Sequence, residues 1–195
     1  MLDRRVLASD SLIKMTVQAI QDWIGPDLSQ LNDFVTLFDL VSDSNKHIQT
    51  AALYSLKQGI SNPSYQESLE RANIDFLIRS ISSSDNPEAI SFVAFALPSL
   101  ALNLARNGHL NTILQFLTCE EPKIREGASA AIEAIANGSP TERQHLVEAE
   151  ILERLIDSGD RLGQTELQIS SVIIPKLAFD FINSGKINLI LGLVE

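Results

Sequence analysis

The sequence predicts an all-α protein built from a repeated unit of three helices. One observation is the spacing of apolar residues, which return every three to four positions, while no segment shows the sustained alternation of a strand. The other is an internal repeat, because a shift of 77 residues superposes two long segments without a gap. A chain of 195 residues is long enough for a short repeat array with a sizeable core.

The 77-residue shift is carried by two separate parts of the chain. It places the segment that begins at Pro98 on the segment that begins at Pro175, and the apolar positions of the two coincide. The same shift places residues 62–74 on residues 139–151. Because both pairs match in one register, we interpret the shift as a repeat of structure.

Prolines mark a shorter period within this unit. Pro63, Pro98, Pro140 and Pro175 follow one another at intervals of 35, 42 and 35 residues. An apolar set with helical i, i+3, i+4 spacing begins 11 or 12 residues after each of them, and an earlier set follows Pro26 more closely. The five sets are Phe34/Leu37/Phe38/Val41, Ile74/Leu77/Ile78, Leu110/Ile113/Leu114, Leu152/Leu155/Ile156 and Ile187/Ile190/Leu191.

Each period is therefore predicted to hold three helices, with all seven prolines at or near helix starts. A short first helix begins near the proline, whose missing N–H and fixed φ suit that position. It ends at Asn73, Gly108, Glu150 or Gly185, where glycine and asparagine fit a left-handed turn and Glu150 is the exception. A second helix carries the apolar set. A third, longer helix follows a polar break, in the segments 42–60, 82–97, 119–138 and 159–174.

Pro98 and Pro175 are expected to interrupt the helical path. Each directly follows an apolar helical segment, which ends at Leu97 or at Ile174. A residue that precedes proline is disfavoured in the α conformation. We therefore predict a sharp bend or break at both prolines, and not one continuous helix through residues 90–106.

Composition narrows the class of partner and the cellular setting. The formal net charge of −10 disfavours nucleic acid, whose binders present basic surfaces, and it suits a basic partner. The single cysteine, Cys119, allows no internal disulfide and favours a reducing compartment. No apolar run reaches the roughly 18 residues of a membrane span, and no signal peptide is evident. We expect a cytoplasmic protein, with the nucleus as the alternative, and no membrane partner.

Residues 124–157, IREGASAAIEAIANGSPTERQHLVEAEILERLID, resemble an armadillo repeat, in which an alanine-rich helix precedes a short polar helix and an apolar one. The segments RNGHLNTILQFL and NSGKINLILGL are similar to the armadillo junction, where a glycine precedes isoleucine or leucine and an apolar helix. HEAT repeats share much of this pattern, but the three-helix division and the glycines favour armadillo repeats. The resemblance covers about residues 26–195.

The resemblance implies a right-handed α-solenoid of about four three-helix repeats, each packed only on its neighbours. The third helices are expected to line a concave face, and small residues to let them approach closely: Ala51, Ala52, Gly127, Ala128 and Ala131. A capping helix is expected at 1–25, with Trp23 inside it. The C-terminal helix is either a cap itself or the cut end of a longer array. The expected units are about 26–62, 63–97, 98–139, 140–174 and a partial unit at 175–195.

No residue pattern in the chain predicts catalysis, a metal site or a cofactor. His47, His109 and His145 are far apart in sequence and share no ligand spacing with Cys119. The glycines form no phosphate-binding loop. An enzyme on a solenoid scaffold stays open as an alternative, and it predicts a deep pocket with converging polar groups.

Binding of a protein or peptide is the expected function, because solenoids present extended concave surfaces. Nuclear-import armadillo proteins hold basic peptides with a ladder of asparagines interleaved with tryptophans. The matching ladder positions here are Gln58, Leu97, Ala134 and Ile174, and the one tryptophan, Trp23, lies outside the array. These departures argue against an import receptor.

The expected contacts with a partner lie on the polar faces of the third helices. They are Gln49, Lys57, Arg125, Glu126, Glu133, Gln168 and Ser171. Two other functions remain open. One is an armadillo-type nucleotide-exchange factor of a heat-shock chaperone, whose repeats residues 62–78 resemble, and the other is a structural module that self-associates through its C-terminal end.

Overall fold

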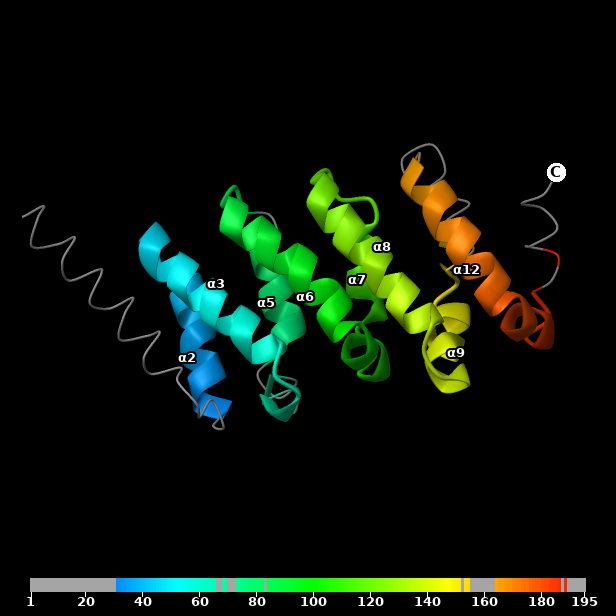
Figure 1. The fold of residues 1–195 in the computed structure, drawn as a ribbon, viewed down its shortest axis with the longest axis horizontal. Coiled ribbons are helices and arrows are strands. Elements are labelled where there is room, and N and C mark those ends of the chain that lie inside the picture. The colour runs from blue at the N-terminus through cyan, green and yellow to red at the C-terminus, as the bar shows by residue number, and fades with distance from the viewer. Residues whose placement is uncertain are drawn as a thin grey trace, which may run out of the picture. The chain divides into compact units, whose positions relative to one another are not determined.

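The structure is a computed structural model, and it describes residues 31–65, 68–69, 73–82, 84–151, 153–154, 164–186 and 188. Within these ranges the chain forms eight α-helices, one 3₁₀ turn and no strand, which confirms the all-α prediction (Figure 1). Two compact units are present, Met1–Phe92 and Val93–Glu195, and the division falls inside one helix. The predicted capping helix and the apolar sets that begin at Leu152 and Ile187 lie outside the described side chains.

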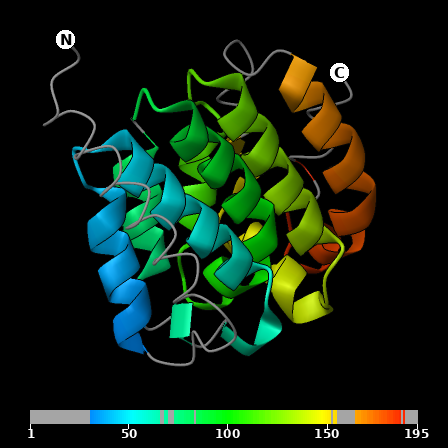
Figure 2. The same cartoon turned by 60° about the vertical axis from the view of Figure 1, so that its left-hand side comes forward.

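The first unit contains the predicted second and third helices of two repeats. α2 packs along α3, as Figure 1 and Figure 2 both show. The apolar sets of α2 and α5 are buried, except that Phe38 is half-buried. The rings of Phe34 and Tyr65 meet edge to face with their centroids 6.2 Å apart, which joins the 3₁₀ turn to this core. The elements are α2 (Leu31–Val41), α3 (Lys46–Ile60), η1 (Pro63–Tyr65), α5 (Ile74–Ile81) and the beginning of α6 (Pro87–Arg106).

The second unit is arranged around α8, which contacts the helices before and after it. The turned view shows α12 beside α8 (Figure 2). Leu110, Ile113 and Leu114, the apolar set predicted for α7, are all buried. The elements are the rest of α6, α7 (Leu110–Phe116), α8 (Pro122–Ala136), α9 (Pro140–Glu148) and α12 (Gln164–Asn183).

Local capping determines where the third helices begin. The side chains of Asn45 and Glu121 accept hydrogen bonds from the backbone N–H two residues later, at the starts of α3 and α8. The first helix α9 begins with a capping box, in which Ser139 and Glu142 each bond the backbone of the other. These caps satisfy N–H groups that have no partner within the helix.

Four of the seven prolines begin a helical element, as predicted. Pro87, Pro122 and Pro140 are the first residues of α6, α8 and α9, and Pro63 begins η1. A proline is harmless there, because the first N–H groups of a helix make no intrahelical bond. Pro26 lies outside the described residues.

The break predicted at the other two prolines is wrong, and the bend predicted there as the alternative stays a prediction. α6 continues through Pro98 and α12 continues through Pro175, so a third helix and the next first helix form one continuous helix. A proline removes one backbone hydrogen bond, but the turns on either side of it stay helical. In α6 they are held by burial, since Leu97 is 0% and Leu100 is 2% exposed.

Gly127 lies against the backbone carbonyl that Pro98 leaves without its usual bond. Pro98 has no N–H, so it cannot donate to the carbonyl of Ala94, four residues earlier. A Cβ atom at Gly127 of α8 would lie 2.6 Å from the Ala94 oxygen and 2.8 Å from the Ala94 Cα. Only a residue without a side chain allows this approach, which suits a weak Cα–H···O contact. The predicted role of a small residue between successive long helices is thus confirmed at Gly127.

The turn after each first helix contains a left-handed residue. Asn73, Gly108 and Gly185 have φ of 60°, 78° and 74°, as predicted. Glu150 is not an exception, because its φ is 57°. The geometry of the repeat therefore imposes a left-handed conformation on a residue with a full side chain, at a cost of about 1 kcal/mol.

Replacing Glu150 by asparagine is expected to raise the free energy of unfolding by about 0.5–1 kcal/mol, because asparagine tolerates the left-handed region. Denaturant titration of the two proteins measures the difference. The same replacement at Glu148, inside α9, should bring no gain. A less stable Glu150→Asn protein would contradict the assignment of strain to this turn.

α6 is apolar and long enough to cross a membrane, with a mean hydropathy of 1.6 over an 18-residue window. The expectation that no segment reaches this length is therefore wrong, since the few polar residues in the helix lower the average only slightly. A core helix meets the same criterion, and 50% of this window is buried within the structure.

Candidate functional site

The exposed side of α8 carries mostly polar side chains. Lys123, Glu126, Ala130, Glu133 and Asn137 are exposed, and we call these five residues the α8 row. They follow one another every three or four positions, so they lie on one side of the helix. The opposite side of α8 is buried in the core, which holds the row on a fixed element.

α12 lies beside the α8 row. Lys176 Nζ is 3.7 Å from Glu133 Oε1, and the two side chains are 34% and 53% exposed. Solvent screens such a pair, so its contribution is below about 1 kcal/mol. Glu126 forms no ion pair with a described residue. The α8 row therefore offers carboxylates that a cationic ligand can reach.

In the first unit, α3 exposes side chains of different chemistry. Thr50, Tyr54 and Lys57 are exposed at helical spacing, and Gln58 is exposed beside them. The Tyr54 ring is 53% exposed. Tyrosine offers a rigid apolar face together with a hydroxyl group, and it is enriched in protein interfaces.

Four of the seven residues predicted to contact a partner are exposed. They are Lys57 in α3, Glu126 and Glu133 in α8, and Ser171 in α12. Exposure does not test contact, so their role stays a prediction. The side chain of Gln168 lies outside the described part of the chain.

The other two, Gln49 and Arg125, are engaged within the protein. Gln49 Nε2 donates to the Val41 carbonyl at 2.8 Å, and its Oε1 accepts from Asn86 Nδ2. Arg125 Nη1 donates to two carbonyl oxygens of the α7–α8 turn, at 2.6 and 2.8 Å. Both side chains tie the beginning of a third helix to the turn before it.

The predicted ladder positions differ in their accessibility. Gln58 is exposed, Ala134 and Ile174 are half-buried, and Leu97 is fully buried. Tyr54 and Asn137 are exposed on the same faces as the predicted contacts, and sequence reasoning missed both. Helical spacing could have identified Tyr54, because it lies three residues before Lys57 and therefore on the same face of the helix.

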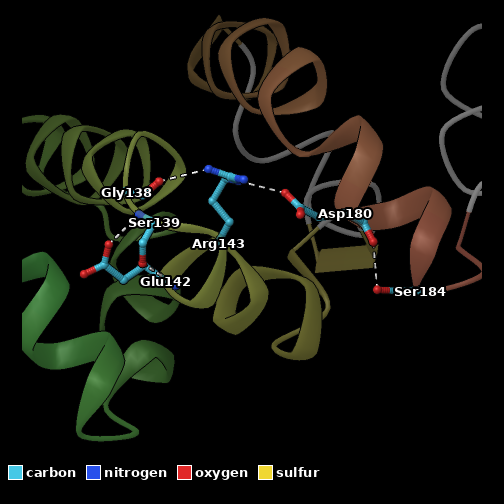
Figure 3. Close-up of polar contacts among 6 residues, drawn as sticks. All are labelled: Gly138, Ser139, Glu142, Arg143, Asp180 and Ser184. Atoms are coloured by element: carbon cyan, nitrogen blue, oxygen red, sulfur yellow. Dashed lines mark hydrogen bonds and ion pairs between the residues drawn. The ribbon is translucent and has the colours of Figure 1, made fainter.

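Polar contacts link the first helices of successive repeats in the second unit (Figure 3). Glu142 in α9 pairs with Arg106 at the end of α6. The next residue, Arg143, donates from Nε to Asp180 Oδ2 of α12 at 2.8 Å, and from Nη1 to a carbonyl of the α8–α9 turn at 2.9 Å. These bonds fix α9 between its two neighbours.

Hydrogen bonds hold the pKa of Glu142 below its usual value. The main cause is the bond from the Ser139 backbone N–H, at 2.6 Å, and the second is the bond from Arg106. A carboxyl group whose pKa is lowered by folding stabilises the folded state. This stabilisation is fully present at pH values above the ordinary carboxyl pKa, about 4.3, and it is lost as the pH falls through the lowered pKa.

Glu142→Gln is therefore expected to lower the melting temperature near pH 7, and the gap to the wild type should close as the pH falls through about 4. Thermal unfolding followed by circular dichroism over a pH series measures the gap. The same replacement at the exposed Glu126 serves as the control and should leave the curve close to that of the wild type. A gap independent of pH would contradict a role for the Glu142 charge.

A depression of about 300 Å³ lies between the α6–α7 turn and the end of α9. Its polar lining includes His145, Glu148, Asn111 and Arg154. Arg154 is bonded to Asn111 Oδ1 at 3.0 Å and to the Ala149 carbonyl at 3.1 Å, and His145 Nδ1 is 4.0 Å from Glu148 Oε2. Arg154 and Asn111 are thus bonded to each other across the depression. Within the described ranges, no group of three or more His, Cys, Asp and Glu could hold a metal ion.

Solved structures with the same helical arrangement include designed proteins. A computationally designed armadillo repeat protein for modular peptide recognition matches with a TM-score of 0.60 at 17% identity, over 92% of this chain and 84% of that one. A designed armadillo repeat protein in complex with the peptide (KR)4 matches with a TM-score of 0.60 at 20% identity, over 87% and 77%. An engineered protein matches with a TM-score of 0.56 at 17% identity. The match covers 75% of this chain and 63% of the engineered protein's length.

No protein-family model and no curated protein matches the sequence. The likeness to solved structures agrees with the all-helical structure, and it confirms the armadillo resemblance at the level of the fold. The chain therefore has the fold of an armadillo repeat protein, an all-α solenoid.

Proposed function

We propose that the protein is a non-catalytic scaffold that binds a basic, extended peptide segment of a protein partner along the exposed faces of α8 and α12, the long helices of the second unit. The observation that carries this proposal is the α8 row, where two glutamates are exposed on a rigid helix. The net charge of −10 attracts cationic ligands at long range. Support comes from the similar designed protein that was solved in complex with (KR)4.

Binding would depend on several weak contacts and not on one strong pair. An exposed ion pair contributes about 0.2–1 kcal/mol, so Glu126 and Glu133 together supply only part of the affinity. Asn137, at the end of the same row, has an amide group that can donate to and accept from a peptide backbone. Because α12 lies beside α8, the exposed faces of these two helices together would contact several residues of an extended chain.

A fluorescently labelled peptide of alternating lysine and arginine tests the proposal by anisotropy. Glu126→Lys is expected to weaken its binding about three- to fivefold, because an attractive pair becomes a repulsive one. Glu148→Lys is the matched control, since it makes the same change of net charge at a side chain that is 63% exposed on α9, outside the α8 row.

The control should weaken binding less than twofold, and added salt should reduce the affinity of both proteins for the peptide. Equal losses in the two variants would assign the binding to net charge alone and overturn the α8 row as the site. Binding of an acidic peptide as tight as that of the basic one would overturn the basic partner.

A further inference from the structure

α3 and α8 are equivalent long helices of two repeats (Figure 1). A shift of 76 residues superposes them, and both have 15 residues. The shift places the N-cap Asn45 on the N-cap Glu121. It also places the C-cap Ser61 on the C-cap Asn137. Each helix has seven buried residues, and six of these positions coincide, so the two helices turn the same side towards the core.

On α3 the positions of the α8 row are occupied by residues of different chemistry. They are His47, Thr50, Tyr54, Lys57 and Ser61, all exposed, and we call them the α3 row. Thr50 and Lys57 stand where α8 has its two exposed glutamates, and Tyr54 stands where α8 has an alanine. The α3 row thus has a cation and an aromatic ring in place of the carboxylates. α3 as a whole contains no acidic residue.

The α3 row is open because of the geometry of the repeat. α8 has a long helix on each side, since α12 contacts it and Gly127 lies against Ala94 of α6. The α8 row is nevertheless exposed. Row positions therefore face away from both neighbouring repeats, and the α3 row would stay exposed if another helix packed beside α3.

We propose that the α3 row binds an acidic, extended segment of a partner protein. Lys57 supplies one ammonium group, and Lys46, which is exposed in the first turn of α3, supplies another. The two residues lie about 20° apart around the helix and about 16 Å apart along it, so they share one side. An extended chain spans this distance with about five residues, and carboxylates at that spacing reach both lysines.

Tyr54 lies between the two lysines along the helix and supplies an uncharged contact. Its side chain is 53% exposed, and its hydroxyl group forms no hydrogen bond with any residue that the structure describes. The ring can pack against an apolar side chain of the segment, while the hydroxyl group donates to a carboxylate. The α3 row therefore combines charge with an aromatic anchor.

The net charge of −10 opposes an acidic segment at long range, so the contact depends on the groups nearest to it. At physiological ionic strength, exposed charges are screened beyond about 8 Å, and the segment responds mainly to Lys46 and Lys57. We expect it to bind more weakly than the basic peptide binds the α8 row. This inference goes beyond the proposed function and does not rest on it, because the two rows belong to different units and take opposite charges.

A fluorescently labelled peptide of alternating glutamate and proline, which stays extended, tests the α3 row by anisotropy. Lys57→Gln is expected to weaken its binding about threefold, because one attraction is lost. Gln115→Glu, at an exposed position of α7, makes the same change of net charge and should weaken binding less than about 1.5-fold. If both variants lost the same affinity, net charge and not the α3 row would explain the binding, and the proposal would be wrong.

Tyr54→Ala tests the row without a change of charge. It should weaken binding of the acidic peptide about fivefold, whereas Phe76→Ala, at a ring that is 62% exposed on α5, should leave it unchanged. Circular dichroism melting shows that each variant is folded. An unchanged affinity in Tyr54→Ala would overturn the proposal. So would a wild type that binds the acidic peptide no better than a peptide of alternating serine and proline.

The lysine–arginine peptide separates this proposal from the proposed function. Lys57→Gln should not weaken binding of that basic peptide, and Glu126→Lys should not weaken binding of the acidic one. A basic peptide that fails to bind the wild type would contradict the proposed function alone. A loss of basic-peptide binding in Lys57→Gln would contradict the assignment of an acidic ligand to the α3 row.

Discussion

Replacing Gly127 by alanine is expected to lower the free energy of unfolding by about 1–3 kcal/mol. The change adds only a methyl group, but that group would lie 2.6 Å from the Ala94 oxygen and 2.8 Å from the Ala94 Cα. Both are backbone atoms of α6, so the clash is relieved only if one long helix moves away from the other. Denaturant titration followed by circular dichroism measures the loss.

The sign of this change separates the clash from helix propensity. Inside a helix, alanine is favoured over glycine by about 1 kcal/mol, so propensity alone predicts a more stable Gly127→Ala protein. Ala130→Gly, at an exposed position of the same helix, measures that preference in place and should destabilise by about 1 kcal/mol. If Gly127→Ala were more stable than the wild type, the close approach of α8 to α6 would be wrong.

Phe181→Ala is expected to lower the free energy of unfolding by about 3–5 kcal/mol, since the ring is 0% exposed and its loss leaves a cavity in the core. In a repeat array each unit is stabilised by its neighbours, so the loss should fall first on the helices nearest to α12. Relative to the wild type, hydrogen exchange measured by mass spectrometry should become faster in α12 of the Phe181→Ala protein and change less in α3.

Phe179, two residues away on the same helix, provides the matched control. Its ring is 72% exposed, so Phe179→Ala should change stability by less than about 0.5 kcal/mol. The pair compares one chemical change on the two sides of α12. Equal losses would show that the orientation of this helix is wrong.

The turns of the repeat were predictable in position, but only partly in conformation. Asn73, Gly108 and Gly185 were recognisable because glycine and asparagine favour the left-handed region. Glu150 was not, because residue preference describes the cost of a conformation and not whether the surrounding fold imposes it. The same limit applies at Pro98, where a local preference against helix is outweighed by buried neighbours on both sides.

The candidate contacts were harder to predict, because sequence spacing gives the face of a helix and not the partners that already occupy it. Glu126 and Gln49 both belong to the polar positions of a third helix. Gln49 is engaged by Asn86, which lies 37 residues further along the chain. Such a partner is known only once the repeats are packed together.

The adjacent pair Glu142 and Arg143 gives the array a direction. The acid bonds backward to Arg106, and the base bonds forward to Asp180, so α9 presents opposite charges to the repeat before it and the repeat after it. A repeat inserted in reverse would set like charges against each other on both sides. α9 thus contacts the preceding repeat through an acidic side chain and the following repeat through a basic one. An additional repeat could be inserted beside α9 only if it presented its acidic and basic side chains in the same order.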